Sequence, residues 1–214
     1  MEVQIFTFNA FSENTILLFD ETKECIVIDP GCYENHEQQE LISFIDNHKL
    51  IPKAIYNTHC HIDHVLGNAF LKKKYGLKLY IHEFDKPTLE TVKIYSSNYG
   101  FHNYEPTSPD GFLLEGDFVK FGHTTLNTLF VPGHAPGHIA FYDKEGNICI
   151  SGDVLFKRSV GRTDFPGCSH EVLLKSIRTK LYTLPDETII YPGHGPTTTI
   201  QEEKRFNPFC SVTP

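Results

Sequence analysis

Thr58-His59-Cys60-His61-Ile62-Asp63-His64 is the stretch that decides the fold and the chemistry of this chain. It places three histidines and an aspartate within seven residues, directly after an apolar segment at residues 54–57. Alternate side chains of an extended backbone face the same way, so His59 and His61 should share one side. Asp63 and His64 follow as the chain turns toward a helix, and they should face a second point nearby. Imidazole and carboxylate groups suit zinc, iron and manganese, so the stretch predicts a metal site.

This motif is too rare to be explained by chance. The chain has 12 histidines among 214 residues, and a random H-x-H-x-D-H is expected in about two of a thousand such chains. We therefore interpret the stretch as a metal site. Cys60 points away from the side that its two histidine neighbours share, so we expect it to be packed or to support a ligand rather than to bind metal.

Length and composition are those of an ordinary globular protein. With 40% hydrophobic and 21% charged residues, the chain fits a single domain over residues 1–214. The net charge of −8 argues against nucleic acid as a partner, because phosphate binding needs a basic surface. No apolar run has the length of a membrane span, and the first residues show no signal-peptide pattern. We expect a cytoplasmic protein with free thiols and no membrane partner, and its oligomeric state stays open.

Hydrophobic periodicity predicts two rounds of strands and helices. The first round has strands at 3–7, 15–19, 24–29, before the histidine motif and at 77–81, with helices at 34–48 and 65–75 and a helix start near 84–87. The second round has strands at 117–121, 124–130, 138–143, 147–151 and 188–191, with a helix at 171–182. Such an order predicts two sheets packed face to face with helices outside.

A loop at residues 96–111 separates the two rounds. Its composition changes to Ser, Asn, Tyr, Pro, Gly and His, and it is long enough to cover a site. Its aromatic residues either wall a pocket or anchor the loop to the body of the protein, and the sequence favours neither. The residues in question are Tyr95, Tyr99, Phe101, His102 and Tyr104.

Three later segments end a predicted strand in a metal-binding residue type. His134 and His194 each follow a Pro-Gly pair, and Asp153 follows a Ser-Gly pair at the end of an apolar run. Glycine lets a backbone approach closely, and proline fixes its direction of entry. Each segment alone is a weak signal, but together with the histidine motif they indicate further ligands.

With these motifs the chain resembles the metallo-β-lactamase superfamily, and within it the glyoxalase II-like (hydroxyacylglutathione hydrolase-like) branch. The resemblance covers essentially the whole chain and implies an α+β fold, a four-layer αββα sandwich with two mixed sheets. It also implies one metal held by His59, His61 and His134, and a second held by Asp63, His64 and His194, with Asp153 shared. About twenty residues follow His194, so we expect the small form without the additional helical domain of larger glyoxalase II enzymes.

Such a site predicts a hydrolase. Two metals about 3.5–4 Å apart can share one water and lower its pKa toward 7, so the expected nucleophile is a metal-bridging hydroxide. Zn²⁺ is the expected metal, with iron and manganese as alternatives. Asp63, which can take a proton from the attacking water, and Asp153 are the catalytic candidates. The sequence reveals no general acid, which favours thioesters over amides, because a thiol leaves with little help. The resemblance to the glyoxalase II-like branch implies thioesters of the S-D-lactoylglutathione type.

Several polar residues have two interpretations. Arg162 and Asp164 bind substrate or, as we prefer, pair with each other to brace their loop. Asp29 supports a metal ligand or caps the end of its strand. Four further histidines have no ligand-like spacing, and we expect most to be structural or exposed: His82, His102, His123 and His138.

Two other functions compete with the hydrolase. A persulfide dioxygenase resembles this chain around the histidine motif and at residues 161–164, and its single iron would correspond to His59, His134 and Asp153. A member that binds metal only for structure is the other alternative. It is disfavoured because structural zinc sites are closed four-ligand cages, usually with cysteine.

Overall fold

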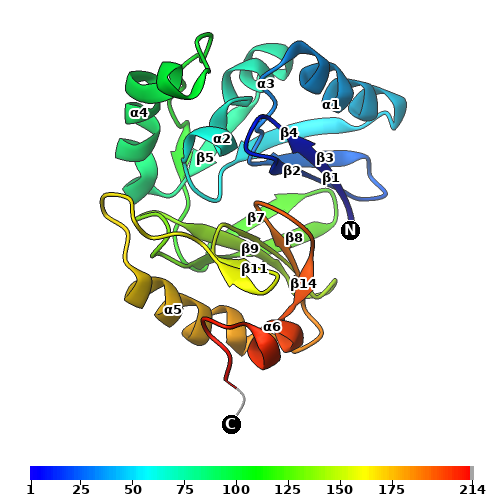
Figure 1. Ribbon diagram of the computed structural model, residues 1–214. Coiled ribbons are helices and arrows are strands. Elements are labelled where there is room, and N and C mark those ends of the chain that lie inside the picture. The colour runs from blue at the N-terminus through cyan, green and yellow to red at the C-terminus, as the bar shows by residue number, and fades with distance from the viewer. Residues whose placement is uncertain (213–214) are drawn as a thin grey trace. The chain divides into compact units, whose positions relative to one another are not determined.

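The computed structural model describes residues 1–212, and the chain divides into two compact units (Figure 1). The N-terminal unit comprises Met1–Leu113 and Lys120–Thr124, and the C-terminal unit comprises Leu114–Val119 and Thr125–Pro214. The two six-stranded sheets are both mixed, with parallel and antiparallel neighbours. Two mixed sheets with helices confirm the predicted fold class, whereas a single domain over residues 1–214 stays a prediction.

The N-terminal sheet has the strand order β1-β2-β3-β4-β5-β6. Neighbours are antiparallel from β1 to β3 and parallel from β3 to β6. Its strands are β1 (Glu2–Phe8), β2 (Glu13–Phe19), β3 (Glu24–Ile28), β4 (Ile51–Tyr56), β5 (Lys78–Ile81) and β6 (Gly111–Phe112). Its helices are α1 (Asn35–Asn47), α2 (Ile62–Val65), α3 (Asn68–Tyr75) and α4 (Lys86–Tyr95), with 3₁₀ turns η1 (Glu83–Asp85) and η2 (Ser96–Tyr99).

Parallel pairing brings the polar ends of two strands together in this unit. Ile28, the last residue of β3, is in register with Tyr56, the last residue of β4. Asp29 and the histidine motif therefore leave the sheet at the same edge, the carboxyl ends of parallel strands where ligands bind in open α/β sheets. Leu41 of α1 and Leu71 of α3 belong to the same buried cluster as Ile55 of β4. Removing this apolar surface from water stabilises the sheet beneath the helices.

The C-terminal sheet has the strand order β14-β13-β10-β9-β8-β7. Gly152 at the end of β10 is in register with Pro192 at the end of the parallel strand β13, so Asp153 and His194 leave one edge. Its strands are β7 (Phe118–Phe121), β8 (Thr124–Phe130), β9 (Ile139–Asp143), β10 (Ile148–Gly152), β13 (Ile189–Pro192) and β14 (Thr198–Thr199). The remaining elements are the hairpin β11 (Leu155–Phe156) and β12 (Ser159–Val160), α5 (His170–Thr179), η3 (Leu181–Thr183) and α6 (Ile200–Phe206).

The predicted helix over residues 65–75 is wrong in its first turn. The chain forms the short α2, which carries Asp63 and His64, and then a separate α3 that begins after Gly67. The N–H of Gly67 donates to the carbonyl of Pro30 at 2.7 Å instead of continuing a helix. A Cβ at Gly67 would lie 2.6 Å from Cys32 Sγ, so this close approach requires glycine. The helix expected at 171–182 likewise ends as α5 at Thr179, before η3.

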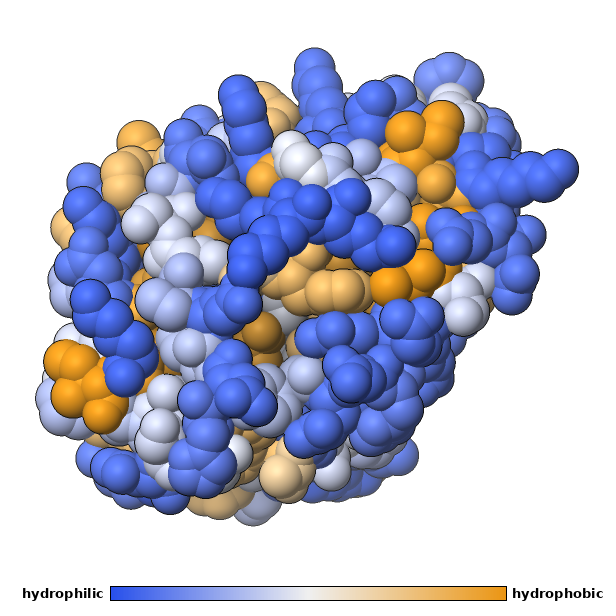
Figure 2. Space-filling model, turned by 90° about the horizontal axis from the view of Figure 1, so that it is seen from above, coloured by the Kyte–Doolittle hydropathy of each residue, from blue (hydrophilic) through white to orange (hydrophobic). Residues whose placement is uncertain are grey.

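Seen from above in Figure 2, the surface is mainly hydrophilic, with small apolar patches between polar side chains. Within residues 1–212, none of the helices combines the length and the apolar character that crossing a membrane requires.

Candidate metal centre

The N-terminal unit gathers all four donors of the histidine motif. His59 lies in the loop after β4, His61 is the N-cap of α2, and Asp63 and His64 lie within that helix. The ring centroid of His59 is 4.7 Å from that of His61 and 4.1 Å from that of His64. Asp63 Oδ2 lies 3.6 Å from His64 Nε2. The four donors therefore converge, with His59 and His64 buried and the other two partly exposed.

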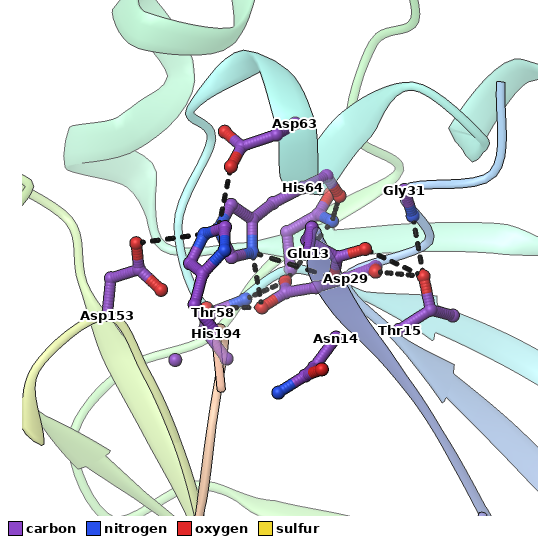
Figure 3. A network of polar contacts seen from close by, with 12 residues as sticks. Glu13, Asn14, Thr15, Asp29, Gly31, Thr58, Asp63, His64, Asp153 and His194 are labelled. Atoms are coloured by element: carbon purple, nitrogen blue, oxygen red, sulfur yellow. Dashed lines mark hydrogen bonds and ion pairs between the residues drawn. The ribbon is translucent and has the colours of Figure 1, made fainter. Parts of the chain in front are cut away.

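Asp29 supports the last of these ligands (Figure 3). Its Oδ1 atom accepts the Thr58 backbone N–H at 2.7 Å, and its Oδ2 atom accepts the Thr58 hydroxyl at 2.6 Å. Oδ2 also lies 3.2 Å from His64 Nδ1. An ionised carboxylate only accepts hydrogen bonds, so the His64 proton belongs on Nδ1 and Nε2 is left to bind a metal on the side of Asp63. Asp29 thus contacts His64, as the supporting role requires, and its bond to the Thr58 N–H holds the backbone that follows the neighbouring strand β4.

Glu13 is a buried carboxylate near the same histidine, and no local sequence pattern indicated it. Its side chain is fully buried in β2, and its Oε1 atom lies 3.8 Å from His64 Nδ1. Its Oε2 atom accepts the Thr15 hydroxyl at 2.9 Å, and that hydroxyl oxygen accepts the Gly31 N–H at 2.8 Å. Burial raises the pKa of the Glu13 carboxyl well above its ordinary value. Glu13 lies far from the histidine motif in the sequence. It comes close to His64 only because β2 pairs with β3 in the sheet.

Gly31 lies in close contact with both the β1–β2 hairpin and the histidine motif. A Cβ at this position would lie 2.0 Å from Glu13 Oε2 and 2.7 Å from both the Asp63 carbonyl and Asn9 Nδ2. Asn9 Nδ2 donates to the carbonyls of Gly31 and Asp63 at 3.1 and 3.0 Å. Glycine after Asp29-Pro30 is therefore needed for the close approach of three segments.

Cys60 is packed, as expected. Its side chain is fully buried in the N-terminal core, and burial raises the pKa of its thiol well above the ordinary value. Its backbone N–H donates to Asp85 Oδ2 at 2.6 Å. Asp85, at the start of α4, thereby fixes the backbone between His59 and His61, a role that the sequence did not reveal.

The C-terminal unit brings together the other three predicted ligands. Asp153 Oδ2 lies 3.5 Å from His134 Nε2 and 3.5 Å from His194 Nε2, and the second contact is drawn in Figure 3. His134 and Asp153 are buried, and His194 is partly exposed. One carboxylate oxygen facing two imidazole nitrogens is the arrangement expected of a shared ligand.

The loop after β12 sets the orientation of His134. His134 Nδ1 donates to the Arg162 carbonyl at 2.7 Å, because a carbonyl oxygen can only accept. The proton therefore lies on Nδ1, and Nε2 keeps its lone pair toward Asp153. A Cβ at Gly161 would lie 1.9 Å from the Asp153 carbonyl and 3.0 Å from His134 Nδ1. Gly161 therefore belongs to the site, because only glycine allows this close approach. Its position directly before Arg162 in the sequence was a signal that could have identified it.

Arg162 and Asp164 pair with each other. Arg162 Nε donates to Asp164 Oδ1 at 2.7 Å, and its Nη2 donates to Oδ2 at 2.6 Å. The arginine also stacks on Phe165, with 4.3 Å between the guanidinium carbon and the ring centroid. Its hydrogen bonds hold the pKa of the Asp164 carboxyl at about 2. The pair required for loop bracing is present, and contact with substrate stays a prediction.

The aromatic loop is anchored to the N-terminal unit. Phe101 is buried, and its ring centroid lies 4.9 Å from that of Tyr33. Tyr33 also accepts the Asn103 N–H at 2.9 Å. His102 is exposed and lines a cavity of about 490 Å³, whose described lining includes none of the predicted ligands. Phe101 and Asn103 therefore anchor the loop, while His102 lines a cavity.

The donor sets fit divalent metal ions. Neutral imidazole and carboxylate are the groups that bind zinc, iron or manganese. In both units hydrogen bonds fix a ring proton on Nδ1, at His64 and at His134, which leaves Nε2 as the donor atom. The buried carboxylate of Asp29 supports the His64 ring and the backbone carbonyl of Arg162 supports the His134 ring, as is usual around metal-binding histidines. All seven predicted ligands are presented by one unit or the other, and their joint role stays a prediction.

Comparisons with a family model, with related sequences and with solved structures agree with one another. A model of the metallo-beta-lactamase superfamily matches residues 9–194. The chain is 40% identical over 213 residues to hydroxyacylglutathione hydrolase GloC of Haemophilus influenzae, covering 99% of each chain. It is 38% identical over 190 residues to the probable metallo-hydrolase YqgX of Bacillus subtilis, covering 88% of each. The crystal structure of TTHA1623 in a di-iron-bound form is 39% identical, with a TM-score of 0.87 over 97% of this chain and 100% of that one.

Proposed function

Because the chain belongs to the metallo-beta-lactamase superfamily and to its metallo-hydrolases, we propose that it hydrolyses glutathione thioesters of 2-hydroxy acids, such as S-D-lactoylglutathione. The observation that carries this proposal is the full-length similarity to hydroxyacylglutathione hydrolase GloC. The shared oxygen of Asp153, at equal distance from two histidines, supports it because a hydrolytic dinuclear site needs a bridging ligand.

We propose that seven residues hold two divalent metals, as the family resemblance implies: His59, His61, Asp63, His64, His134, Asp153 and His194. Bound there, such metals would lower the pKa of a water and polarise the acyl carbonyl. Within the chain, Asp29 holds His64 and the Arg162 carbonyl holds His134, so both rings keep one orientation. Asp63 is partly exposed next to His64 and takes the proton from the attacking water. The thiol product needs no general acid, because its pKa is near 8.5.

Zinc is our proposed metal, and iron is the alternative that the di-iron-bound form of TTHA1623 favours. A cytoplasmic location is also proposed. It is supported by the six cysteines, all of which are free thiols, as expected in a reducing compartment.

Purified protein expressed without added metal provides the test. Metal content is measured, and release of free thiol is followed with S-D-lactoylglutathione and with the D-lactoyl thioester of N-acetylcysteamine, which lacks the glutathione peptide. We expect close to two metals per chain and a kcat/KM at least about tenfold higher for the glutathione thioester, about 1.4 kcal/mol of transition-state binding.

Two control reactions separate the alternatives. Glutathione persulfide tests for oxygen uptake, and a chromogenic β-lactam tests for lactam hydrolysis. One iron per chain with oxygen uptake and no thioester hydrolysis would replace our proposal by a persulfide dioxygenase. Equal rates on both thioesters would mean that the protein does not recognise glutathione. If the metal-loaded protein turned over none of these substrates, a non-catalytic role would be favoured.

A further inference from the structure

His138 occupies a special position beside β9 and β10. These strands pair antiparallel, with Ile150 opposite Phe141 and Cys149 opposite Tyr142. The same register, continued beyond the last pair, places Asp153 opposite His138. His138 directly precedes β9 and Asp153 directly follows β10. The two residues therefore face each other where the backbone ladder between these strands stops.

Beyond the last backbone pair, the His138 side chain takes the place of a backbone carbonyl as hydrogen-bond acceptor. The backbone N–H of Asp153 donates to Nε2 of His138 at 3.1 Å. The imidazole is completely buried, and Asp153 is 7% exposed. A buried N–H without a partner is costly, so the ring satisfies a group that must otherwise find an acceptor elsewhere. Because Nε2 accepts, the proton of this ring lies on Nδ1, and the tautomer is fixed.

The backbone of His138 also holds the segment that carries His134. The His138 carbonyl accepts the N–H of Val131 at 2.9 Å, and the His138 N–H donates to the Ala135 carbonyl at 3.4 Å. The ring centroids of His134 and His138 are 6.0 Å apart. One residue is therefore bonded both to the turn around His134 and to the backbone of Asp153.

We propose that His138 is a positioning residue, which fixes the backbone of Asp153 so that its carboxylate meets His134 and His194. This inference rests on the proposed function, because Asp153 matters as a shared ligand of two metals. The ring acts through one accepted hydrogen bond, so another side chain with an acceptor at the same distance should replace it. Among neutral residues, glutamine can place its Oε1 close to the position of His138 Nε2.

The test compares His138→Leu with His138→Gln. Leucine fills the buried space and removes the acceptor, whereas glutamine keeps it. Ile150→Val serves as the matched control, because it loosens β10 at the last pair of the ladder and leaves the Asp153 N–H bonded to His138. Zinc affinity is measured by competition with a chromophoric chelator, alongside metal content, melting temperature of the metal-free protein and thioester hydrolysis.

We expect His138→Leu to lose 10–100-fold in affinity for at least one metal, the range typical of residues that orient ligands. His138→Gln should recover most of this loss, and Ile150→Val should bind metal like the parent despite a lower melting temperature. Parent-like affinity in His138→Leu, or an equal loss in Leu and Gln variants, would overturn the positioning role. A parent protein that binds two metals but hydrolyses no thioester would instead overturn the proposed function, and the affinity comparison would still decide the role of His138.

Discussion

The Oδ2 atom of Asp29 lies 3.2 Å from the Nδ1 atom of His64, and both side chains are buried. The carboxylate stands at the end of β3, and the histidine belongs to the helix after β4, so parallel pairing of the two strands creates this contact. The bond fixes the proton on Nδ1 and makes Nε2 a better donor to a cation.

Asp29→Asn is therefore expected to weaken metal binding by about 10–100-fold without unfolding the protein. Asparagine keeps the size of the side chain and an acceptor for Thr58, but it loses the charge next to His64. The measurement is zinc affinity by chelator competition, with circular dichroism to check the fold. Unchanged affinity in a folded variant would show that Asp29 serves the fold rather than the ligand.

Gly161→Ala tests how closely the loop after β12 approaches the ligands. The new Cβ would lie 1.9 Å from the Asp153 carbonyl and 3.0 Å from His134 Nδ1, so one of these segments must move. We expect metal content to fall below two per chain and activity to drop by at least about tenfold. Crystals of the variant in which both ligands keep their positions, with full activity, would contradict this reading of Gly161.

Each predicted ligand lies in a short local pattern, which is why the sequence alone could suggest it. The histidine motif and the Pro-Gly-His and Gly-Asp strand ends need no knowledge of distant pairing. Glu13 and His138 stayed hidden because their contacts depend on register: β2 must pair with β3, and β9 with β10. The same reason explains the wrong first turn of the helix predicted at 65–75, since Pro30 lies far from Gly67 in sequence.

Helix α6 was missed for a different reason. Its seven residues are too few for a clear hydrophobic period, yet Thr199 caps it by accepting the Glu202 N–H at 3.2 Å. A threonine followed three residues later by glutamate is a recognisable start signal, so this element was available to a sequence-based prediction.

Asp20 should make the stability of the N-terminal unit depend on pH. Burial alone would raise the pKa of this carboxyl, but hydrogen bonds from Thr22, His123 and Thr124 outweigh it and lower the pKa to about 2. The ordinary value is about 3.9, so the folded state binds the proton less tightly than the unfolded chain. The stabilisation, about 2 kcal/mol, is therefore complete above about pH 5 and is lost as the pH falls toward 2.

Urea unfolding of the parent and of Asp20→Asn measures this contribution. At neutral pH we expect the variant to have a free energy of unfolding lower by about 2 kcal/mol, and at about pH 3 the difference should shrink. Both proteins are measured with a chelator present, so that protonation of metal ligands cannot distinguish them. A difference that is the same at both pH values would mean that the carboxylate charge is not the cause.

Arg162→Ala and Asp164→Ala together separate loop bracing from substrate binding. If the two side chains only hold each other, both variants should lower the melting temperature slightly and equally, with kcat and KM unchanged. This is the outcome we expect, because both side chains are well exposed and already paired. An increase in KM confined to Arg162→Ala, at unchanged kcat, would instead assign the arginine to substrate binding.

Asp153→Ala should be the most damaging single substitution at the metal centre. Its Oδ2 atom lies 3.5 Å from both His134 Nε2 and His194 Nε2, so a carboxylate in this place can hold two cations and offset part of their repulsion. In the proposed assignment His194 binds only one of the two cations, so His194→Ala should affect one of them. We expect Asp153→Ala to lose both metals and at least about a hundredfold in kcat, and His194→Ala to keep about one metal and more residual activity.

The comparison requires both variants to be folded by circular dichroism, with metal content determined on the same samples that are assayed for thioester hydrolysis. Asp153→Asn is the size-matched companion, because it keeps one oxygen but removes the charge that offsets the two cations. It should retain more metal than the alanine variant and still lose most activity. If Asp153→Ala keeps two metals and near-parent activity, the carboxylate cannot be a shared ligand, and the dinuclear assignment of the seven residues must be abandoned.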